Sequence, residues 1–399
     1  MKKIYTNKFF YPLIEDPFSK DDINEGVKVL KSKQITISKK TKHFEKRFNS
    51  TLKTNYSLMV NSGSSANLLA LQCLINPYRK KRLNYGDEVI IPTLCWSTSL
   101  WPIIQANLKP VFIDINPDTL NIDESQIEKK ITKRTKAILL VHVLGNSCNL
   151  DLILKIKKKY NLILIEDTCE SLGSKFKNKY LGSFGDFSSF SFYTSHQISS
   201  GEGGMISCKD KIDYNIIKSL RSHGWSRDTS FENKFSKKYS NLDKRFIFFN
   251  SGYNLRPTEV SAAIGHNQLK KLNQFIKIRK INKLKIIQKI KQNSNLNNII
   301  DFFYESKKVN PSWFGIPIKI IKNIKNKRKI LDNLEKNGVE TRPIISGNFA
   351  KQPASIKYKL SLKRKFPVTD QVYNSSFFIG LPTKKITNKY LNKLIKAFE

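Results

Sequence analysis

The chain has 399 residues, 39% of them hydrophobic, and a formal net charge of +39 at pH 7. This length and composition exclude a disordered chain and predict a packed globular core in about two domains. The longest apolar runs are shorter than the roughly 20 residues of a membrane helix, and no apolar segment typical of a signal peptide follows the first lysines. We therefore expect a cytoplasmic protein without membrane contact.

The positive charge and the cysteines exclude two further classes. Lysine is scattered along the chain with isoleucine and asparagine, and no arginine-rich arm, zinc finger or RNA-binding signature accompanies it. We therefore expect no nucleic-acid partner, although the charge favours small anions such as sugar nucleotides. The five cysteines form no CxxC pair, so neither a disulfide framework nor a metal site is expected.

Short apolar runs alternate with amphipathic segments from about residue 56 to residue 210. Such alternation predicts a mainly parallel sheet with helices on both faces, and ligands at the carboxyl ends of its strands. Strands are expected at 56–60, 87–92, 109–115, 136–145 and 162–168, with helices at 66–75 and 150–160.

The pattern changes after about residue 255. A long helix is expected at 256–290, with Pro257 near its start. A strand at 312–320, a helix ending at Gly338 and a strand at 339–345 follow. We expect an N-terminal arm and a large cofactor-binding domain over 1–254. The long connecting helix and a small C-terminal α+β domain occupy 255–399.

Two polar groups follow apolar strands in the first half of the chain. Gly63, Ser64 and Ser65 come just before a helix, where backbone N–H groups and hydroxyls bind anions, although serine also caps helices without any ligand. Glu166 and Asp167 end an apolar strand. A carboxylate there binds magnesium, pairs with a protonated ring nitrogen or caps a helix.

Two further stretches bear on ligand binding. Trp96 lies just past a buried strand, where its ring either stacks on a planar ligand or joins the core. Ser191, Ser195 and His196 precede the glycine-rich stretch "GEGG", which reads as a binding loop or as a plain hairpin turn. Each of these four motifs is weak alone.

The four motifs together are more specific. With the stretches "NSGSSAN", "EDTCES", "GEGGMI", "GYNLRPTEVSAAIG" and "VETRPIISGNF", their order closely resembles the DegT/DnrJ/EryC1/StrS family of sugar aminotransferases over nearly the whole chain. The resemblance implies a fold-type I transferase that depends on pyridoxal phosphate (PLP), an α/β protein with a mainly parallel, seven-stranded sheet covered by helices. It also implies a smaller C-terminal α+β domain, a homodimer, and PLP or pyridoxamine phosphate (PMP) as cofactor.

The resemblance also assigns roles to residues. It implies that the cofactor phosphate is bound by the anion turn and the end of a strand, that an aromatic ring stacks on the pyridine, and that Asp167 pairs with the pyridinium nitrogen. Asn254 would reach the phosphate across the dimer interface. The implied cofactor-binding residues are Gly63, Ser64, Ser65, Trp96, Asp167, Glu170, Ser191 and Asn254. The implied substrate-binding residues are His223, Arg227, Arg342 and Asn348.

His196 departs from the family's aminotransferases, which carry a lysine at its position. Imidazole has an ordinary pKa of about 6.5 and moves protons, but it forms no stable Schiff base with an aldehyde. The cofactor would then not be covalently held, and PMP would persist as the working form.

This departure resembles the family's 3-dehydratases of nucleotide-linked 4-keto-6-deoxy sugars, and most of all the branch that acts on GDP-4-keto-6-deoxymannose in the colitose pathway. The resemblance implies that His196 and Asp167 are catalytic and that L-glutamate restores PMP. Ammonia is released, and the deoxysugar goes to a surface polysaccharide such as an O-antigen.

Three alternatives are weighed against this reading. A related dehydratase branch carries an iron–sulfur cluster, but no cysteine follows Cys208 to supply its ligands, so we expect no cluster. An aminotransferase with a displaced lysine would have to use Lys175, Lys177 or Lys179, which lie in a polar stretch that reads as a hairpin. A non-catalytic regulator that retains the cofactor fold is the third. Ammonia release, an amino-sugar product, or cofactor binding without turnover distinguishes these readings.

Overall fold

The computed structural model describes residues 9–360 and 365–399, so residues 1–8 of the stretch tested for a signal peptide lie outside it. Its largest sheet has seven strands in the order β1-β9-β8-β5-β4-β2-β3. Neighbouring strands from β3 to β8 are parallel, whereas β9 runs antiparallel to β8 and β1. The strands are β1 (Tyr56–Val60), β2 (Glu88–Pro92), β3 (Lys109–Ile113), β4 (Thr135–Val141), β5 (Ile163–Asp167), β8 (Phe187–Ser191) and β9 (Gly204–Cys208).

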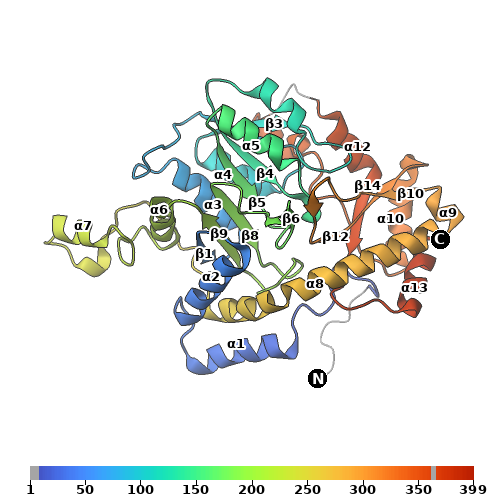
Figure 1. Ribbon diagram of the computed structural model, residues 1–399, viewed down its shortest axis with the longest axis horizontal. Helices are drawn as coiled ribbons and strands as arrows, with labels where there is room; N and C mark the ends of the chain where they lie inside the picture. Colours follow the sequence, from blue (N-terminus) through green and yellow to red (C-terminus); the bar gives the residue numbers. More distant parts are fainter. Residues whose placement is uncertain (1–8, 361–364) are drawn as a thin grey trace.

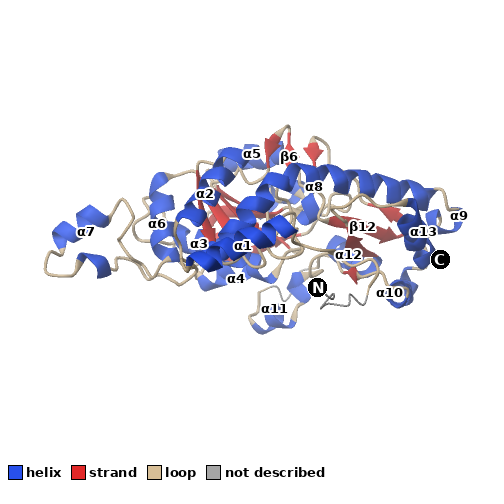
Figure 2. Ribbon diagram, turned by 90° about the horizontal axis from the view of Figure 1, so that it is seen from below, coloured by secondary structure: helices blue, strands red, loops and turns tan. Residues whose placement is uncertain are grey.

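Helices cover both faces of this sheet (Figures 1 and 2). Successive side chains of a strand point to opposite faces, so Val89 and Ile91 pack with α3, α4 and α6, whereas Ile90 packs with α5. The helices are α2 (Lys39–Leu52), α3 (Gly63–Leu74), α4 (Ser97–Gln105), α5 (Leu150–Lys159) and α6 (Lys211–Arg221). The predicted mainly parallel, seven-stranded α/β architecture is confirmed.

In the first half of the chain, two boundaries differ from the sequence prediction by three residues or more. Helix α3 begins at Gly63, three residues before the predicted start, because the Ser62 hydroxyl accepts a hydrogen bond from the N–H of Ser65 and caps the helix there. Strand β4 ends at Val141 instead of continuing to 145. The chain turns there into the 3₁₀ helix η3 (Val143–Gly145), with Leu144 in a left-handed conformation.

The C-terminal part contains α8 (Glu259–Lys291) and a four-stranded antiparallel sheet in the order β10-β12-β14-β13. Strand β13 is shorter than predicted, since Pro343 has no N–H for the ladder. The strands are β10 (Ile300–Phe302), β12 (Gly315–Ile320), β13 (Thr341–Arg342) and β14 (Ser376–Gly380). The helices around them are α9 (Ser294–Asn297), α10 (Lys327–Lys336), α11 (Pro353–Lys357), α12 (Pro367–Ser375) and α13 (Asn388–Phe398).

The remaining elements are short or peripheral. Helix α1 (Lys20–Ser32) packs along α8, and α7 (Glu232–Lys238) lies at the far end of the molecule, away from the C-terminal sheet (Figure 1). A small sheet joins β6 (Lys175–Phe176), β7 (Lys179–Tyr180) and β11 (Val309–Asn310). The other 3₁₀ helices are η1 (Glu124–Gln126), η2 (Glu128–Lys130), η4 (Lys244–Phe246), η5 (Ile324–Asn326) and η6 (Phe349–Lys351).

The N-terminal arm packs against the C-terminal sheet. Tyr11 forms a β-bridge with Val339, and its hydroxyl donates to the carbonyl of Gly380 at 2.9 Å. The C-terminal part of the chain therefore packs against its N-terminal arm. The predicted domain boundary between residues 254 and 255 stays a prediction. Within residues 9–360 and 365–399, every helix is too short or too polar to span a bilayer.

Candidate active site

The carboxyl ends of β1, β5 and β8 meet at Gly63. A Cβ atom on Gly63 would lie 2.7 Å from the Sγ of Cys169 and 2.7 Å from the Cβ of Ser191. These three segments are far apart in the sequence, and only a residue without a side chain allows them to approach so closely. The structure therefore brings together the anion turn, the segment after Asp167 and the end of β8, as predicted from the strand order.

The turn around Gly63 presents hydroxyls and free N–H groups. Ser64 shares a 2.7 Å hydrogen bond with Thr98 at the start of α4, and Ser65 donates to the side chain of Asn61 at 2.6 Å. Among the described residues, the N–H groups of Gly63 and Ser64 donate to no acceptor. They lie at the positive end of a 12-residue helix, which attracts an anion such as a phosphate.

Asp167 ends β5 and is held by two side chains that the sequence prediction missed. Its Oδ2 accepts from Asn67 at 2.8 Å and from Ser99 at 2.7 Å, and Oδ1 accepts from the N–H of Cys169 at 3.2 Å. Asn67 lies one helical turn after Gly63, a spacing that places it on the same side of α3. These bonds fix the carboxylate at the strand end, in a position to meet a ligand cation.

Glu166 points to the other face of β5. Its carboxylate accepts from the N–H groups of Gly182, Phe184 and Gly185 and lies 3.0 Å from the Nε2 of His142, with both side chains fully buried. Of the two carboxylates considered from the sequence, Glu166 therefore has a structural role, and Asp167 is the one available to a ligand.

Trp96 immediately precedes α4, and its side chain is 57% exposed. A tryptophan buried in the core was the competing interpretation, and the structure contradicts it. An exposed indole beside the strand ends has a free face for a planar ligand.

His196 lies on the loop between β8 and β9. Its Nδ1 is 2.5 Å from the carbonyl oxygen of Cys169, and its ring makes an edge contact with Phe314 at 5.2 Å between centroids. A carbonyl only accepts, so Nδ1 carries the proton and Nε2 of the neutral ring has a free lone pair. Among the described residues, no hydrogen-bond partner of Nε2 is found.

The surroundings keep this imidazole neutral. Burial lowers the pKa of His196 to about 4; the Cys169 carbonyl and Asp167 raise that pKa, and the cation of Arg279 lowers it. At neutral pH, His196 is therefore a base ready to accept a proton at Nε2.

Glu170 is the first carboxyl group after Asp167, in the segment that follows β5. Its side chain accepts from the N–H of Leu144 at 2.9 Å, and burial raises its pKa to about 7. Its backbone carbonyl accepts from the side chain of Gln197, the residue after His196. Glu170 thus lies beside the histidine loop, as a group that holds a proton near neutral pH.

Three of the predicted site residues lie near one another and apart from Asp167 and His196: His223, Arg227 and Asn254. His223 donates its N–H to Tyr253, next to the exposed Asn254. The His223 ring lies 4.9 Å from the ring of Trp225, and the guanidinium of Arg227 lies 4.3 Å above the same ring. Among the described residues, none of the three contacts Asp167 or His196 within this chain. Their predicted roles stay predictions.

Arg342 and Asn348 have partners within the C-terminal part. Arg342 forms an ion pair with Glu340 at 2.7 Å. Asn348 is buried, donates to Asp370 at 2.9 Å and accepts from the N–H of Ala350. Its substrate role stays a prediction. In this structure the backbone of Asn348 forms a β-bridge to Leu94, which joins the C-terminal segment to the neighbourhood of Trp96.

The lysines proposed for a displaced Schiff base are engaged elsewhere. They belong to the predicted hairpin, formed by β6 and β7. Lys175 lies 4.5 Å above the ring of Tyr180, Lys177 pairs with Asp151 at 2.8 Å, and Lys179 lies 4.9 Å above the ring of Phe184.

All five cysteines are free thiols; Cys169 is half-buried at the site and the others are buried.

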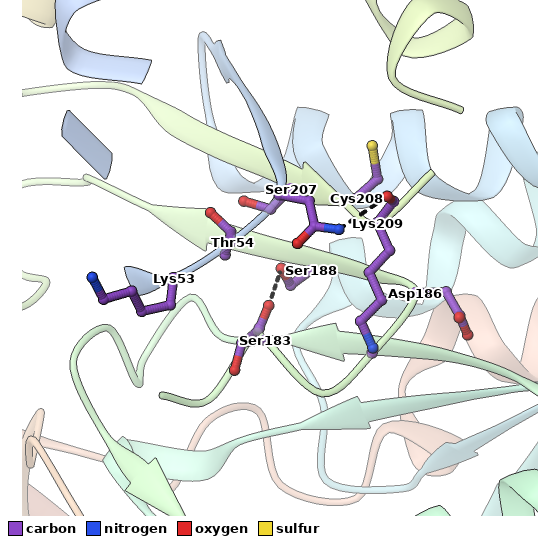
Figure 3. Close-up of a pocket in the computed structure, with 11 residues that line it drawn as sticks. Lys53, Thr54, Ser183, Asp186, Ser188, Ser207, Cys208 and Lys209 are labelled. Carbon is purple, nitrogen blue, oxygen red and sulfur yellow. Dashed lines mark hydrogen bonds between the residues drawn. The ribbon is translucent and has the colours of Figure 1, made fainter. Parts of the chain in front are cut away.

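Two hollows of different size lie at the two edges of the molecule's large sheet. A cavity of about 540 Å³ opens beside His196, lined by the N-terminal arm, α8 and the segment after β14. A much smaller hollow of about 20 Å³ lies at the opposite edge of the sheet, where Asp186 precedes β8 and Lys209 follows β9 (Figure 3). Only the first adjoins a candidate catalytic residue.

The chain belongs to the DegT/DnrJ/EryC1/StrS aminotransferase family, whose model matches residues 17–399. It is 40% identical over 351 residues to the GDP-4-keto-6-deoxy-D-mannose 3-dehydratase of Escherichia coli O55:H7, covering 87% of this chain and 89% of that protein. The family predicted from the sequence motifs is thereby confirmed.

Solved structures agree with this relationship. The E. coli GDP-4-keto-6-deoxy-D-mannose-3-dehydratase with bound hydrated PLP has a TM-score of 0.89 and 35% identity, covering 98% of this chain and 100% of that chain. A structure of GDP-4-keto-6-deoxymannose-3-dehydratase with a trapped PLP–glutamate geminal diamine has the same TM-score at 36% identity, with the same coverage. The predicted fold-type I transferase fold is confirmed.

Proposed function

We propose that this chain is a PMP-dependent 3-dehydratase of a nucleotide-linked 4-keto-6-deoxyhexose, with GDP-4-keto-6-deoxymannose as substrate and L-glutamate as amino donor. The observation that carries the proposal is His196. A neutral imidazole with a free Nε2 stands where the family's aminotransferases have a lysine, and the hairpin lysines are engaged elsewhere. The relatives named above have the same activity in their names.

The residues present fit PLP or PMP. Gly63 leaves a cradle that a single Cβ would fill, beside the free N–H groups of a helix start, and these suit the cofactor phosphate. The carboxylate of Asp167, fixed by two donors, suits a protonated pyridine nitrogen. The exposed indole of Trp96 offers a stacking face.

Each residue then has a definable task. When bound, PMP supplies an amine for the sugar's 4-keto carbon and a ring that accepts electrons. Asp167 keeps the ring nitrogen protonated by its negative charge. With the cofactor held there, Nε2 of His196 would accept a proton from the cofactor's aminomethyl carbon and would deliver it to the departing 3-hydroxyl. The carbonyl of Cys169 holds the imidazole in the required tautomer.

Atoms and electrons balance over the whole reaction. The sugar exchanges its 3-hydroxyl for hydrogen, and glutamate becomes 2-oxoglutarate. The nitrogen of glutamate leaves as ammonia, because the unsaturated amino sugar released from the enzyme hydrolyses to the ketone. No external reductant is needed, since the oxidation of glutamate supplies the two electrons.

The same proposal includes a homodimer in the cytoplasm. The ring of His223 and the guanidinium of Arg227 contact the ring of Trp225, and Asn254 follows Tyr253, whose carbonyl accepts from the N–H of His223. Among the described residues, none of these three predicted residues contacts His196 in its own chain. Large apolar side chains of the adjoining segment are exposed, as expected for a surface that a second subunit covers: Tyr239, Leu242, Phe246 and Phe248. This arrangement supports a site completed by the partner subunit.

The decisive assay incubates purified protein with PLP, glutamate and GDP-4-keto-6-deoxymannose. We expect one ammonia and one 2-oxoglutarate for each sugar that loses its 3-oxygen, as read by product NMR and mass. An amino sugar would establish the aminotransferase alternative instead, and cofactor binding without turnover of this or other nucleotide-linked 4-keto sugars would favour the regulator.

A further inference from the structure

Arg279 is a buried cation that the proposed reaction does not explain. It lies on α8, is 3% exposed and reaches two segments that are remote in the sequence. Its Nε donates to the carbonyl of Leu381 at 3.1 Å, and its Nη2 donates to the carbonyl of His196 at 3.4 Å. The guanidinium therefore joins the backbone of the histidine loop to the segment that follows β14.

Within residues 9–360 and 365–399, no carboxylate pairs with this charge. Among the described residues, Arg279 forms no ion pair, and its Nη1 has no hydrogen-bond partner although it is buried. A buried, unpaired cation costs free energy, which is consistent with burial lowering the pKa of Arg279 to about 10. A residue with such a cost that contacts the candidate base calls for a functional explanation.

The neighbouring turn of α8 makes the same segment rigid. Asn282 is fully buried, donates to the carbonyls of Pro382 and Lys384 at 3.0 and 2.8 Å, and accepts from the N–H of Ile386. The segment after β14 is therefore fastened to α8 independently of Arg279. The guanidinium donates to this fixed segment through Nε and to the carbonyl of His196 through Nη2.

We infer that Arg279 is a positioning residue for His196: it holds the backbone of the histidine loop against α8 and places its positive charge beside the imidazole, so that Nε2 stays unprotonated and aimed at the cofactor. The inference rests on the proposed function in naming His196 as the base. Its structural part, the control of His196 by Arg279, is measurable without turnover.

The charged groups around His196 allow the sign to be worked out. Asp167 faces the ring and favours the imidazolium, Arg279 opposes it from α8, and burial opposes it further. Across the 540 Å³ cavity, Asp22 is paired with Lys271 and Asp16 with Lys384, so these four nearly cancel. Removing the charge of Arg279 leaves burial alone to oppose Asp167, so the pKa of His196 should rise while staying below its ordinary value.

Lys283 provides a control on the same helix, a buried cation that differs from Arg279 in being paired with Glu305 at 3.7 Å. It lies one turn further along α8, is 2% exposed, and donates to the carbonyl of Phe303 at 3.4 Å while its ammonium lies 3.5 Å above the ring of Trp313. Lys283→Met thus removes a buried cation from the same helix without touching the histidine loop.

The test compares Arg279→Met, Arg279→Lys and Lys283→Met. NMR titration of the His196 ring in each purified protein should show an upward pKa shift in Arg279→Met alone. Arg279→Lys, which keeps the charge, should retain the low pKa. If the methionine variant does not fold, Arg279→Gln, which removes the charge but keeps a hydrogen-bond donor, should show the same upward shift, and an unchanged titration there would count against the inference. Turnover should fall about 10- to 100-fold in Arg279→Met, mainly in kcat, as expected for a misplaced base.

The outcomes separate the two claims. An unchanged His196 titration in Arg279→Met, or equal losses of kcat in Arg279→Met and Lys283→Met, would overturn the inference and make Arg279 a purely structural residue. A shifted titration in a protein that never releases ammonia would support the inference and contradict the proposed function.

Discussion

Acidification distinguishes His196 from an ordinary histidine. We predict that the His196 imidazole stays neutral at a pH where an ordinary imidazole is half protonated. The ordinary pKa of histidine is about 6.5, and burial lowers the pKa of His196 to about 4. At pH 6.5 an unperturbed imidazole would be half protonated, whereas fewer than about 1% of the His196 rings should carry the second proton. The shift corresponds to about 3 kcal/mol of differential stabilisation of the neutral ring.

When the pH falls, His196 and the neighbouring Glu170 change the free energy of unfolding in opposite directions. The unfolded chain binds a proton at His196 near pH 6.5 and the folded chain only near pH 4, so stability falls over that window as the pH falls. Burial raises the pKa of Glu170 to about 7, so the folded chain binds that proton first and gains stability as the pH falls from about 7 to 4.5. Because the two terms offset each other, global unfolding is a poor readout of His196.

A residue-specific assay avoids this cancellation. The chain has five histidines, and the ring signals of His196 can be assigned by their loss in His196→Asn. Titration by heteronuclear NMR should show an Nδ1–H tautomer that persists from pH 8 to about pH 5. The acid limb of the kcat profile should lie below about pH 5 as well. A His196 pKa between 6 and 7, or the Nε2–H tautomer at neutral pH, would refute the reasoning.

Three further perturbations test the surroundings of the site. Gly63→Ala places a Cβ 2.7 Å from Cys169 and Ser191, and should lower the free energy of unfolding by about 1–3 kcal/mol in urea titrations and weaken cofactor retention. Asp167→Asn removes the charge and turns an amide NH2 towards groups that donate to Asp167, so turnover should fall about 10- to 100-fold in steady-state assays and the melting temperature should fall as well. Replacing the three hairpin lysines together by alanine should leave kcat within about twofold and the cofactor absorbance unchanged, since exposed pairs contribute little; a loss of both would revive the displaced lysine.

The strands and the edge that carries the site were predictable from the sequence. Runs of β-branched residues that end in Asp167 or in the turn before Gly63 placed the polar residues at strand ends, and parallel strands bring such ends together. The antiparallel course of β9 and its pairing with β1 had no local signal, because pairing depends on partners about 150 residues away. Such long-range pairings escape reasoning from local patterns.

The contacts that tune the site were not predictable. Nothing in the sequence indicates that the carbonyl of Cys169 selects the tautomer of His196, since a backbone carbonyl is common to every residue. Arg279 lies 83 positions from His196 in the sequence, within a lysine-rich helix where one more cation attracts no notice. The bond from the side chain of Asn348 to Asp370, 22 positions further along the chain, likewise has no sequence signal, and the substrate role of Asn348 stays a prediction. Side-chain pairing of this kind is decided by packing and not by spacing.

The central claim is that a histidine in place of the lysine directs nitrogen to ammonia instead of to the sugar. Nitrogen-15-labelled glutamate, supplied with PLP and GDP-4-keto-6-deoxymannose to the wild-type protein and to His196→Asn, follows that nitrogen directly. The account predicts that all label turned over by the wild type appears in ammonia, and that His196→Asn, which keeps a donor for the Cys169 carbonyl but lacks the base, loses about 100- to 10,000-fold in rate. Label retained in the sugar, or an unimpaired variant, would contradict it.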